Sequence, residues 1–263
     1  MKSAVAAMAA MLILAPSARA AGDKPVVAVI PKGTTHVFWR SIHAGAAKAA
    51  RELGVQIIWQ GPQKEDDRQM QIEVVQNFIS RGVDAMVLAP LDNVALVRPV
   101  RQAVGRGIKV VIIDSGLNCD DYLSFVATDN YRGGKLAGEK LAELLGGKGK
   151  VMMLRYAEGS ASTMERERGF LDAIAAAGPG IEPVSVNQYG GVTSDTAFQA
   201  GQNLLNKHSE LDGIFCPRSR PRPAPRSARA YRAETCRRRL QIRRRACAAC
   251  ITAAPATTRP RAR

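Results

Sequence analysis

The chain has 263 residues, of which 46% are hydrophobic and 5% aromatic, a composition typical of a globular protein with two lobes or one large α/β domain. Its formal charge of +15 suggests nucleic-acid binding, but residues 217–263 hold fifteen Arg and one acid and carry +14 of that charge. Residues 1–216 are therefore close to neutral, so the basic signal belongs to the C-terminal segment alone.

The first twenty residues have the pattern of a secretory signal peptide. Lys2 supplies a positive charge, residues 4–14 are apolar, and Ala18-Arg19-Ala20 is a small-x-small cleavage site. An apolar run of this length is too short to span a bilayer, which needs about 20 residues. We expect cleavage after Ala20 and export of the remaining chain.

Strand and helix patterns then alternate. Apolar strand patterns cover residues 26–30, 55–60, 85–90, 109–114 and 124–129. Helical patterns cover 39–53, 69–80 and a stretch after Leu91-Asp92-Asn93 that ends at Gly105 or Gly107. Gly54 and Gly82 are predicted to end the first two helices, and Asp66 and Asp67 are candidate N-caps of the second. Continuous apolar strands of this kind are typical of parallel sheets buried on both faces.

From Asn130 the alternation restarts, with helices predicted over 131–145, 164–177 and 194–207 and strands over 150–156, 184–189 and 213–216. Small residues in the first of these helices are expected to allow close packing on a sheet. We therefore predict an α/β protein with parallel sheets flanked by helices in two lobes, residues 24–128 and 129–216. The predicted hinge consists of Thr128, Asp129 and Asn130.

From Pro217 the apolar periodicity stops, and Arg, Ala and Pro dominate to residue 263. One interpretation is a disordered basic tail that contacts phosphates or acidic surfaces. The other is a reading-frame slip in a GC-rich gene, which is favoured because lysine vanishes and the change directly follows a predicted strand. On either interpretation the second lobe is incomplete, and exposed sheet edges would then promote aggregation.

The sequence carries none of the common hydrolase, metalloprotease, P-loop or dinucleotide-binding motifs. His36, His43 and His208 are dispersed, so no metal site is expected. We predict a protein that is not an enzyme and binds no cofactor.

The loop after the first predicted strand contains His36, Phe38 and Trp39. Ligands of open α/β sheets bind beyond the carboxyl ends of the strands, so this loop lies where a ligand is expected. The alternative is that Phe38 and Trp39 only pack the following helix on the sheet.

Other polar residues also lie at or after strand ends. Asp114 can accept two hydroxyl hydrogen bonds, or it can simply cap the turn at Gly116. Arg166 can reach ligand oxygens across a cleft, or it can pair with a neighbouring glutamate, Glu165 or Glu167. Gln188 ends another strand and is either a ligand contact or an ordinary polar edge residue.

Taken together, these segments resemble periplasmic solute-binding proteins of the ribose-binding type. The resemblance is carried, in order, by VVAVIPKGTTHVFWRSIHAGAAKAARELG, DAMVLAPLD, KVVIIDS, SFVATDNYRGGKLAGEKL, MERERGF, QNLL and LDGIFC, which run from Val26 to Cys216. It implies two lobes that close by a hinge on a small sugar or similar polyhydroxylated ligand, in the periplasm, with delivery to an ABC transporter permease.

The resemblance also implies roles for individual residues. His36 matches a polar ligand contact, Phe38 and Trp39 match an aromatic pair that stacks on the sugar ring, Asp114 matches a carboxylate that grips adjacent hydroxyls, and Arg166 matches an arginine of the second lobe.

The sequence departs from this pattern at two further positions. Ser115 stands where ribose binders have an arginine, which argues against ribose itself, and Val192 stands where many relatives have a second-lobe aromatic.

A monomer is expected, and a chemoreceptor is a further candidate partner. The competing hypothesis is a secreted protein whose Arg-rich tail binds nucleic acid or another acidic partner, with an affinity that falls steeply as salt rises. The predicted signal peptide argues against nucleic acid as that partner.

Overall fold

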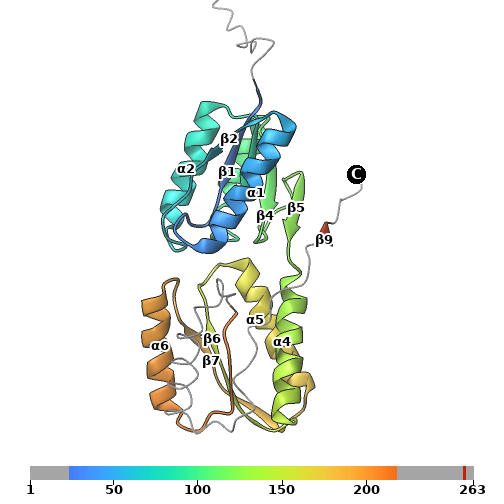
Figure 1. Ribbon diagram of the computed structural model, residues 1–263, viewed down its shortest axis with the longest axis vertical. Coiled ribbons are helices and arrows are strands. Elements are labelled where there is room, and N and C mark those ends of the chain that lie inside the picture. Colours follow the sequence, from blue (N-terminus) through green and yellow to red (C-terminus); the bar gives the residue numbers. More distant parts are fainter. Residues whose placement is uncertain (1–23, 218–256, 259–263) are drawn as a thin grey trace, which may run out of the picture.

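The computed structural model describes residues 24–217 and 257–258, and it contains two α/β lobes stacked along the long axis of the molecule (Figure 1). The predicted signal peptide and most of the predicted tail lie outside the described residues. The elements of the first lobe are β1 (Val26–Ile30), α1 (Val37–Leu53), β2 (Gln56–Trp59), α2 (Arg68–Arg81), β3 (Ala85–Leu88), α3 (Val97–Gly105), β4 (Lys109–Ile113) and β5 (Ser124–Ala127). The sheet order is β2-β1-β3-β4-β5-β9, with β9 (Thr257–Thr258) antiparallel to β5 and the other pairs parallel.

The second lobe holds a three-stranded parallel sheet in the order β7-β6-β8. Its elements are α4 (Asn130–Leu145), β6 (Gly149–Arg155), α5 (Ala161–Ala176), β7 (Ile181–Tyr189), α6 (Ser194–Lys207) and β8 (Gly213–Phe215). The predicted α/β class and the parallel sheets are thereby confirmed. Within the described residues, no helix is both long and apolar enough to cross a bilayer.

Most of the predicted element boundaries match the structure because local capping chemistry sets them. Gly54 and Gly82 adopt the left-handed conformation that ends α1 and α2, and the Asp67 side chain accepts a hydrogen bond from the backbone N–H of Met70. Two starting points were wrong by three residues: β7 begins at Ile181 instead of residue 184, and α5 begins at Ala161 instead of residue 164. The first turn of α5 begins with the small residues Ala161, Ser162 and Thr163, of which the serine and threonine are also common in loops.

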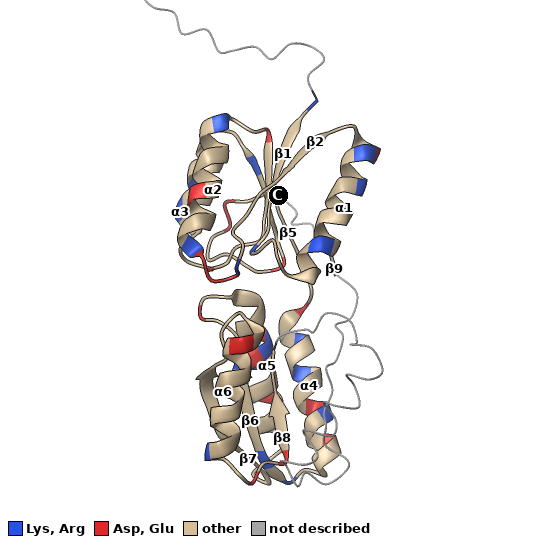
Figure 2. Ribbon diagram, turned by 60° about the vertical axis from the view of Figure 1, so that its left-hand side comes forward, with Lys and Arg blue, Asp and Glu red and all other residues tan. Residues whose placement is uncertain are grey.

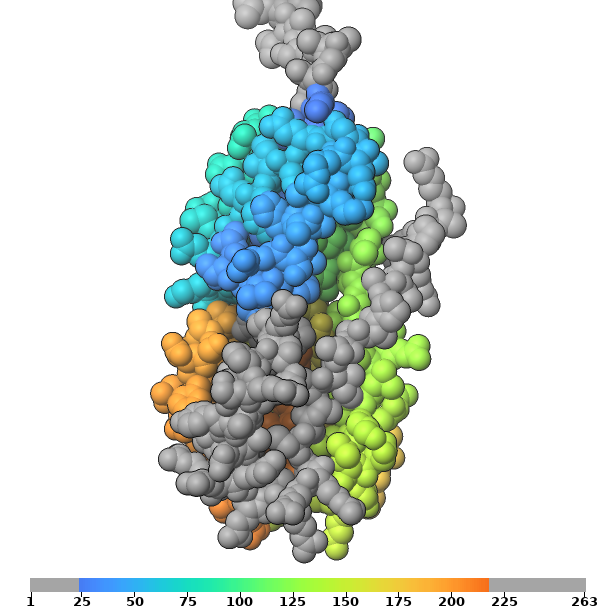
Figure 3. Space-filling view, viewed as in Figure 1, coloured from blue at the N-terminus to red at the C-terminus, as the bar shows by residue number. Residues whose placement is uncertain are grey.

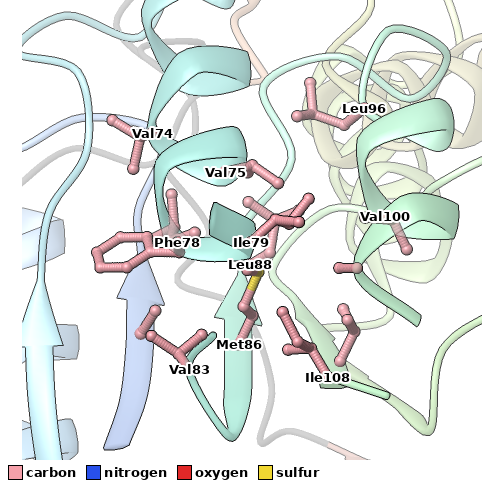
Figure 4. Close-up of a cluster of buried hydrophobic side chains, with 14 of the residues drawn as sticks. Val74, Val75, Phe78, Ile79, Val83, Met86, Leu88, Leu96, Val100 and Ile108 are labelled. Carbon is pink, nitrogen blue, oxygen red and sulfur yellow. The ribbon is translucent and has the colours of Figure 1, made fainter. Parts of the chain in front are cut away.

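The main hydrophobic core lies between the first sheet and the helices α2 and α3 (Figure 4). Phe78 on α2, Leu88 on β3 and Ile112 on β4 have no exposed surface. Each such side chain contributes about 1.5–3 kcal/mol through removal from water. This core fixes the sheet, and with it the position of every strand end.

The first sheet has helices on both of its faces, as predicted, but the two faces are not equally buried. Helices α2 and α3 cover one face, whereas α1 lies on the other (Figure 2). Val87 and Val111 point to this second face and are only partly buried. In the second lobe, by contrast, apolar clusters lie on both faces of β6, and four of its residues in a row are buried.

The small residues of α4 pack against helix α5, not against a sheet as we predicted. A Cβ atom added at Gly134 would lie 1.9 Å from the backbone oxygen of Arg166, and one at Gly138 would lie 2.7 Å from the Ala173 side chain. These glycines let the two helix backbones approach closely. The contact sets the direction in which α5 begins, toward the first lobe (Figure 1).

This packing predicts opposite effects for two adjacent substitutions. Gly134→Ala should lower the free energy of unfolding by about 1–3 kcal/mol, because the helices must move apart to admit the methyl group. Gly133→Ala is the matched control, since nothing lies within 4 Å of its added Cβ, and it should raise stability by roughly 0.5–1 kcal/mol. Urea denaturation followed by circular dichroism measures both, and equal effects of the two variants would contradict the assignment.

Candidate functional site

The candidate site is a cleft between the lobes, at the carboxyl ends of the parallel strands. The strand order of the first sheet reverses direction at β1 and β3, and ligands of such sheets bind beside that reversal. Charged segments of both lobes face each other there, and the lobes meet across the middle of the molecule (Figures 2 and 3). The cleft is lined by Lys32, His36, Phe38, Trp39, Glu65, Asp114, Tyr156, Ser162, Thr163 and Arg166.

Lys32, in the loop after β1, is the most completely buried charged group of the cleft. Its side chain is 3% exposed, and its Nζ lies 3.1 Å from Asp114 Oδ2. The same ammonium donates to the hydroxyl oxygens of Ser115, Ser160 (3.2 Å) and Ser162 (3.3 Å). A buried charge is tolerated only when it is paired and hydrogen-bonded, and here both conditions are met.

Asp114 directly follows β4 and has a φ of 64°, a left-handed conformation that is rare outside glycine and costs roughly 1–2 kcal/mol. Its carboxylate forms the ion pair with Lys32, so it does more than cap the turn at Gly116. The next residue, Ser115, is 1% exposed, and its Oγ accepts a hydrogen bond from the backbone N–H of Ser162 in the second lobe (3.1 Å). The β4 end therefore contacts both the Lys32 loop and helix α5.

Gln71 on α2 positions the loops that follow β1 and β3. Its side chain is fully buried; Nε2 donates to the carbonyl oxygens of Pro31 (3.0 Å) and Ala89 (2.8 Å), and Oε1 accepts from the N–H of Leu91 (2.8 Å). One amide therefore satisfies three backbone groups at the sheet edge. This network holds the backbone next to Lys32 in place.

The two aromatic residues of the first loop have different surroundings. Trp39 is 2% exposed, and its Nε1 donates to Glu65 Oε1 (3.1 Å), so it belongs to the core as well as to the wall of the cleft. Phe38 packs edge-on against Trp39 and is 40% exposed. His36 is the N-cap of α1 through its Nδ1, which accepts from the N–H of Phe38. The buried Trp39 therefore fits the packing hypothesis, whereas the partly exposed Phe38 remains available for a ligand.

Glu65 joins the lobes. It lies in the connection between β2 and α2, and its Oε2 accepts a hydrogen bond from the hydroxyl of Tyr156, which follows β6 (2.8 Å). Since its Oε1 binds Trp39, this carboxylate links the aromatic wall of the first lobe to the second lobe.

Arg166 on α5 does not pair with its neighbouring glutamates. Glu165 pairs with Arg168 and Glu167 with Arg155, whereas the Arg166 guanidinium donates to Asn130 Oδ1 (2.8 Å) and to the Pro217 carbonyl (2.9 Å). Burial lowers the pKa of Arg166, and the nearby Asp114 carboxylate acts in the opposite direction. The cation thus lines the cleft, while the side-chain amide of Asn130 and the Pro217 carbonyl that accept its hydrogen bonds are neutral.

Of the predicted ligand residues, the structure brings His36, Phe38, Trp39, Asp114 and Arg166 together, with Ser115 buried beside them.

Gln188 is not among the residues that line the cleft. Its side chain is exposed on β7, and its Nε2 lies 3.4 Å from the Tyr189 carbonyl oxygen. The predicted hinge residues lie where the chain passes from β5 to α4, with Asp129 as the N-cap of that helix and Asn130 as the acceptor for Arg166.

Five lining residues were not predicted from the sequence, and they are Lys32, Glu65, Tyr156, Ser162 and Thr163. Lys32 and Tyr156 could have been found, because each lies within two residues of the end of a predicted strand. The two α5 residues were missed because that helix begins earlier than expected.

The cleft encloses a cavity of only about 60 Å³ in this arrangement. Sites for small molecules usually enclose about 300–1,000 Å³, so the lobes must separate to admit a ligand of the size of a sugar. A larger hollow of about 720 Å³ lies at the opposite edge of the first sheet, beside Pro25, Asp84 and Lys109. It is bordered by the amino ends of β1, β3 and β4 and is remote from the converging polar groups.

The comparisons with known protein sequences and with solved structures point to the same family. Residues 27–234 match the model of a periplasmic binding protein domain. The D-ribose/D-allose-binding protein of Pseudomonas aeruginosa is 31% identical over 201 residues, which are 73% of this chain and 62% of that protein. The chain thus spans about three fifths of the length of this curated relative.

Solved structures agree with this match. The periplasmic component of an ABC-type sugar transport system from Hahella chejuensis has a TM-score of 0.70 and 33% identity, and the alignment covers 73% of this chain and 70% of that one. A periplasmic solute-binding protein of an ABC transporter from Actinobacillus succinogenes, with bound D-allose, has a TM-score of 0.69 and 26% identity over 82% of this chain and 77% of its own.

The different burial of the two aromatic residues predicts different effects of truncation. Trp39→Ala should lower the free energy of unfolding by about 3–5 kcal/mol, because it removes a core side chain and the indole N–H that donates to Glu65 Oε1. Phe38→Ala, the matched control in the adjacent position, should cost well under half as much because its ring is partly exposed. Thermal and urea unfolding measure both losses of stability. Similar losses for the two variants would contradict the assignment of Trp39 to the core and of Phe38 to the surface of the cleft.

Proposed function

The chain belongs to the periplasmic binding protein family, and from this premise we propose that it is the solute-binding component of an ABC importer. Its ligand is a small sugar or a similar polyhydroxylated molecule, bound between the lobes by hinge closure. The protein acts as a binding protein without catalytic activity. It works in the periplasm, to which the predicted signal peptide directs it. Its partner is the permease of the transporter, and a monomer delivers the ligand.

The observation that carries this proposal is the convergence of ligand-gripping groups from both lobes on one cleft. Asp114 offers carboxylate oxygens to hydroxyl groups, while Lys32 and Arg166 offer N–H donors. The exposed face of Phe38 suits the C–H face of a sugar ring. Because sugars bury little apolar surface, selectivity depends on satisfying each hydroxyl group.

The relatives support a sugar as the ligand class. The relative from Pseudomonas aeruginosa is named for D-ribose and D-allose, and the structure from Actinobacillus succinogenes holds D-allose. Ser115 is bonded to Lys32 and to the Ser162 N–H in this chain, which gives the position after Asp114 a structural task between the lobes. We infer a pentose or hexose ligand other than ribose.

Closure by a hinge requires that ligand contacts favour the closed arrangement. A ligand can shift the ratio of closed to open molecules only by the factor by which its affinities for the two arrangements differ. Thr128, Asp129 and Asn130 form the proposed hinge, because there the chain passes between the lobes and Asn130 is also bonded to Arg166. A ligand that engages Arg166 thus acts directly beside the hinge.

The alternative function, a protein with a basic tail that binds nucleic acid or another acidic partner, depends on residues 217–263. These lie outside the described residues except for Pro217 and β9. The cleft gives that alternative no support, since its polar groups are of both signs and lie between the lobes.

Asp114 is the residue whose substitution tests the proposal most directly. In titration calorimetry of the full chain with D-allose, D-arabinose and D-ribose, we expect at least one sugar to bind. Asp114→Ala should then abolish measurable binding, since each lost hydrogen bond to a charged acceptor costs about tenfold or more in affinity.

Two further variants separate charge from conformation and from surface effects. Asp114→Asn tolerates the left-handed backbone but removes the charge, and it should also bind more weakly. Asp121→Ala is the control, because it removes an exposed carboxylate that pairs with Arg101 outside the cleft, and it should bind like the wild type. Unchanged affinity of Asp114→Ala would refute the site, and failure of all sugars to bind would refute the ligand class.

A further inference from the structure

Arg166 lines the cleft with a guanidinium that is only partly bonded. Its Nε donates to Asn130 Oδ1 (2.8 Å), and its Nη1 donates to the Pro217 carbonyl oxygen (2.9 Å). A guanidinium has five N–H groups, so these two bonds leave three, of which two are on Nη2. Within the described residues, no acceptor is bonded to these three groups, and no buried side-chain nitrogen lacks a partner. The Nη2 edge of the guanidinium is therefore accessible from the cleft.

Helix α4 fixes both ends of the Arg166 side chain. A Cβ atom added at Gly134 would lie 1.9 Å from the Arg166 backbone oxygen, so the backbones of α4 and α5 are in contact at this point. Asn130, the first residue of α4, lies about one turn before Gly134 and therefore on the same face of the helix. Its side-chain oxygen reaches the guanidinium, while Gly134 sets the position of the arginine backbone. The direction of the guanidinium thus follows from the packing of α4 on α5.

Asn130 is buried and is not among the residues that line the cleft; its exposed fraction is 8%. Its side-chain amide is neutral, so it fixes the arginine without cancelling the positive charge, as a carboxylate at the same place would do. The full charge of Arg166 is therefore available to a ligand oxygen. A hydrogen bond from a charged donor is about twice as strong as one between neutral groups.

We propose that Asn130 is a positioning residue for ligand binding, which acts by holding the Arg166 guanidinium with its Nη2 edge toward the cleft. The inference rests on the proposed function, because Arg166 is there assigned a contact with the ligand. A guanidinium that is already held loses less conformational freedom when a ligand binds, so more of the contact energy appears as affinity. Asn130 thereby contributes to affinity without touching the ligand.

The held guanidinium also defines what the ligand must present. Arg166 offers only N–H donors, and the carboxylate of Asp114, which lines the same cleft, offers only acceptor oxygens. A hydroxyl group can accept a hydrogen bond from the arginine or donate one to the carboxylate. A ligand with several hydroxyl groups can therefore satisfy both residues at once, whereas a ligand that carries only acceptors satisfies Arg166 alone.

The first test needs no ligand and uses NMR spectroscopy of the full chain. The Nε–H signal of Arg166 is identified by its loss in Arg166→Lys, and its rate of exchange with solvent protons is measured. Asn130→Ala removes the acceptor, and we expect this exchange to become about tenfold faster or more. Asn130→Asp keeps an acceptor oxygen in place and should keep the exchange slow. Unchanged exchange in Asn130→Ala overturns the inference, whether or not any sugar binds.

The second test is titration calorimetry with D-allose, D-arabinose and D-ribose. Asn130→Ala should weaken the binding of a sugar that the wild type binds by about tenfold, because the guanidinium is no longer held. Asn118→Ala is the control and should bind like the wild type, since its exposed amide pairs with Asn93 outside the cleft. In an Arg166→Lys background, which lacks the Nε donor, Asn130→Ala should cause no further loss. An equal loss in both backgrounds, or no loss in the wild-type background, overturns the inference.

Two further controls separate these outcomes from misfolding and from the ligand class. Circular dichroism verifies that each variant is folded, and Asn130→Leu, which also removes the acceptor oxygen, replaces Asn130→Ala if that variant is not. If none of the three sugars binds the wild type, the proposed function fails, and the exchange rates alone decide whether Asn130 holds Arg166.

Discussion

The buried ammonium of Lys32 sets a constraint that the rest of the cleft satisfies. A cation removed from water must be paired, and the pairing residue, Asp114, adopts a left-handed backbone that places its carboxylate beside the Lys32 loop. The remaining protons find acceptors on α5, whose direction follows from the close packing of glycines on α4. One ion pair in the first lobe is thus connected, through helix packing, to the arrangement of the second.

The two lobes differ in how firmly they hold their side of the cleft. In the first lobe, α2 and α3 bury one face of the sheet, and Gln71 ties the loops that carry the site to that core. In the second lobe the sheet has three strands within the described residues, and the site residues lie on α5 and at the end of β6. The second lobe therefore presents its groups mainly through one helix, and movement of α5 would change several contacts together.

Local chemistry explains what could be predicted from the sequence. Gly54, Gly82 and Asp67 fix helix ends by backbone conformation or capping, and the apolar runs between them identify the strands. Positions after strand ends led to His36, Asp114 and their neighbours in the cleft. Burial of Lys32 was not predictable in this way, because lysine is usually exposed and its partners lie up to 130 residues away. Gln188 shows the same limit, since β6 and β7 pair with register shifts, and one residue of shift moves a side chain to the other face.

The present contacts of the cleft and the contacts of a bound ligand satisfy the same polar side chains with different donors. In the present arrangement, the ammonium of Lys32 satisfies Asp114 and the serine hydroxyl groups of both lobes. A polyhydroxylated ligand carries donors and acceptors of its own, so it can replace these bonds one for one while Arg166 and Phe38 supply the remaining contacts. The net gain on binding is then the small difference between two well-bonded arrangements, not the sum of the contacts in either one. Selectivity follows from that difference, because a ligand that leaves one buried polar group unsatisfied binds more weakly than one that satisfies every group.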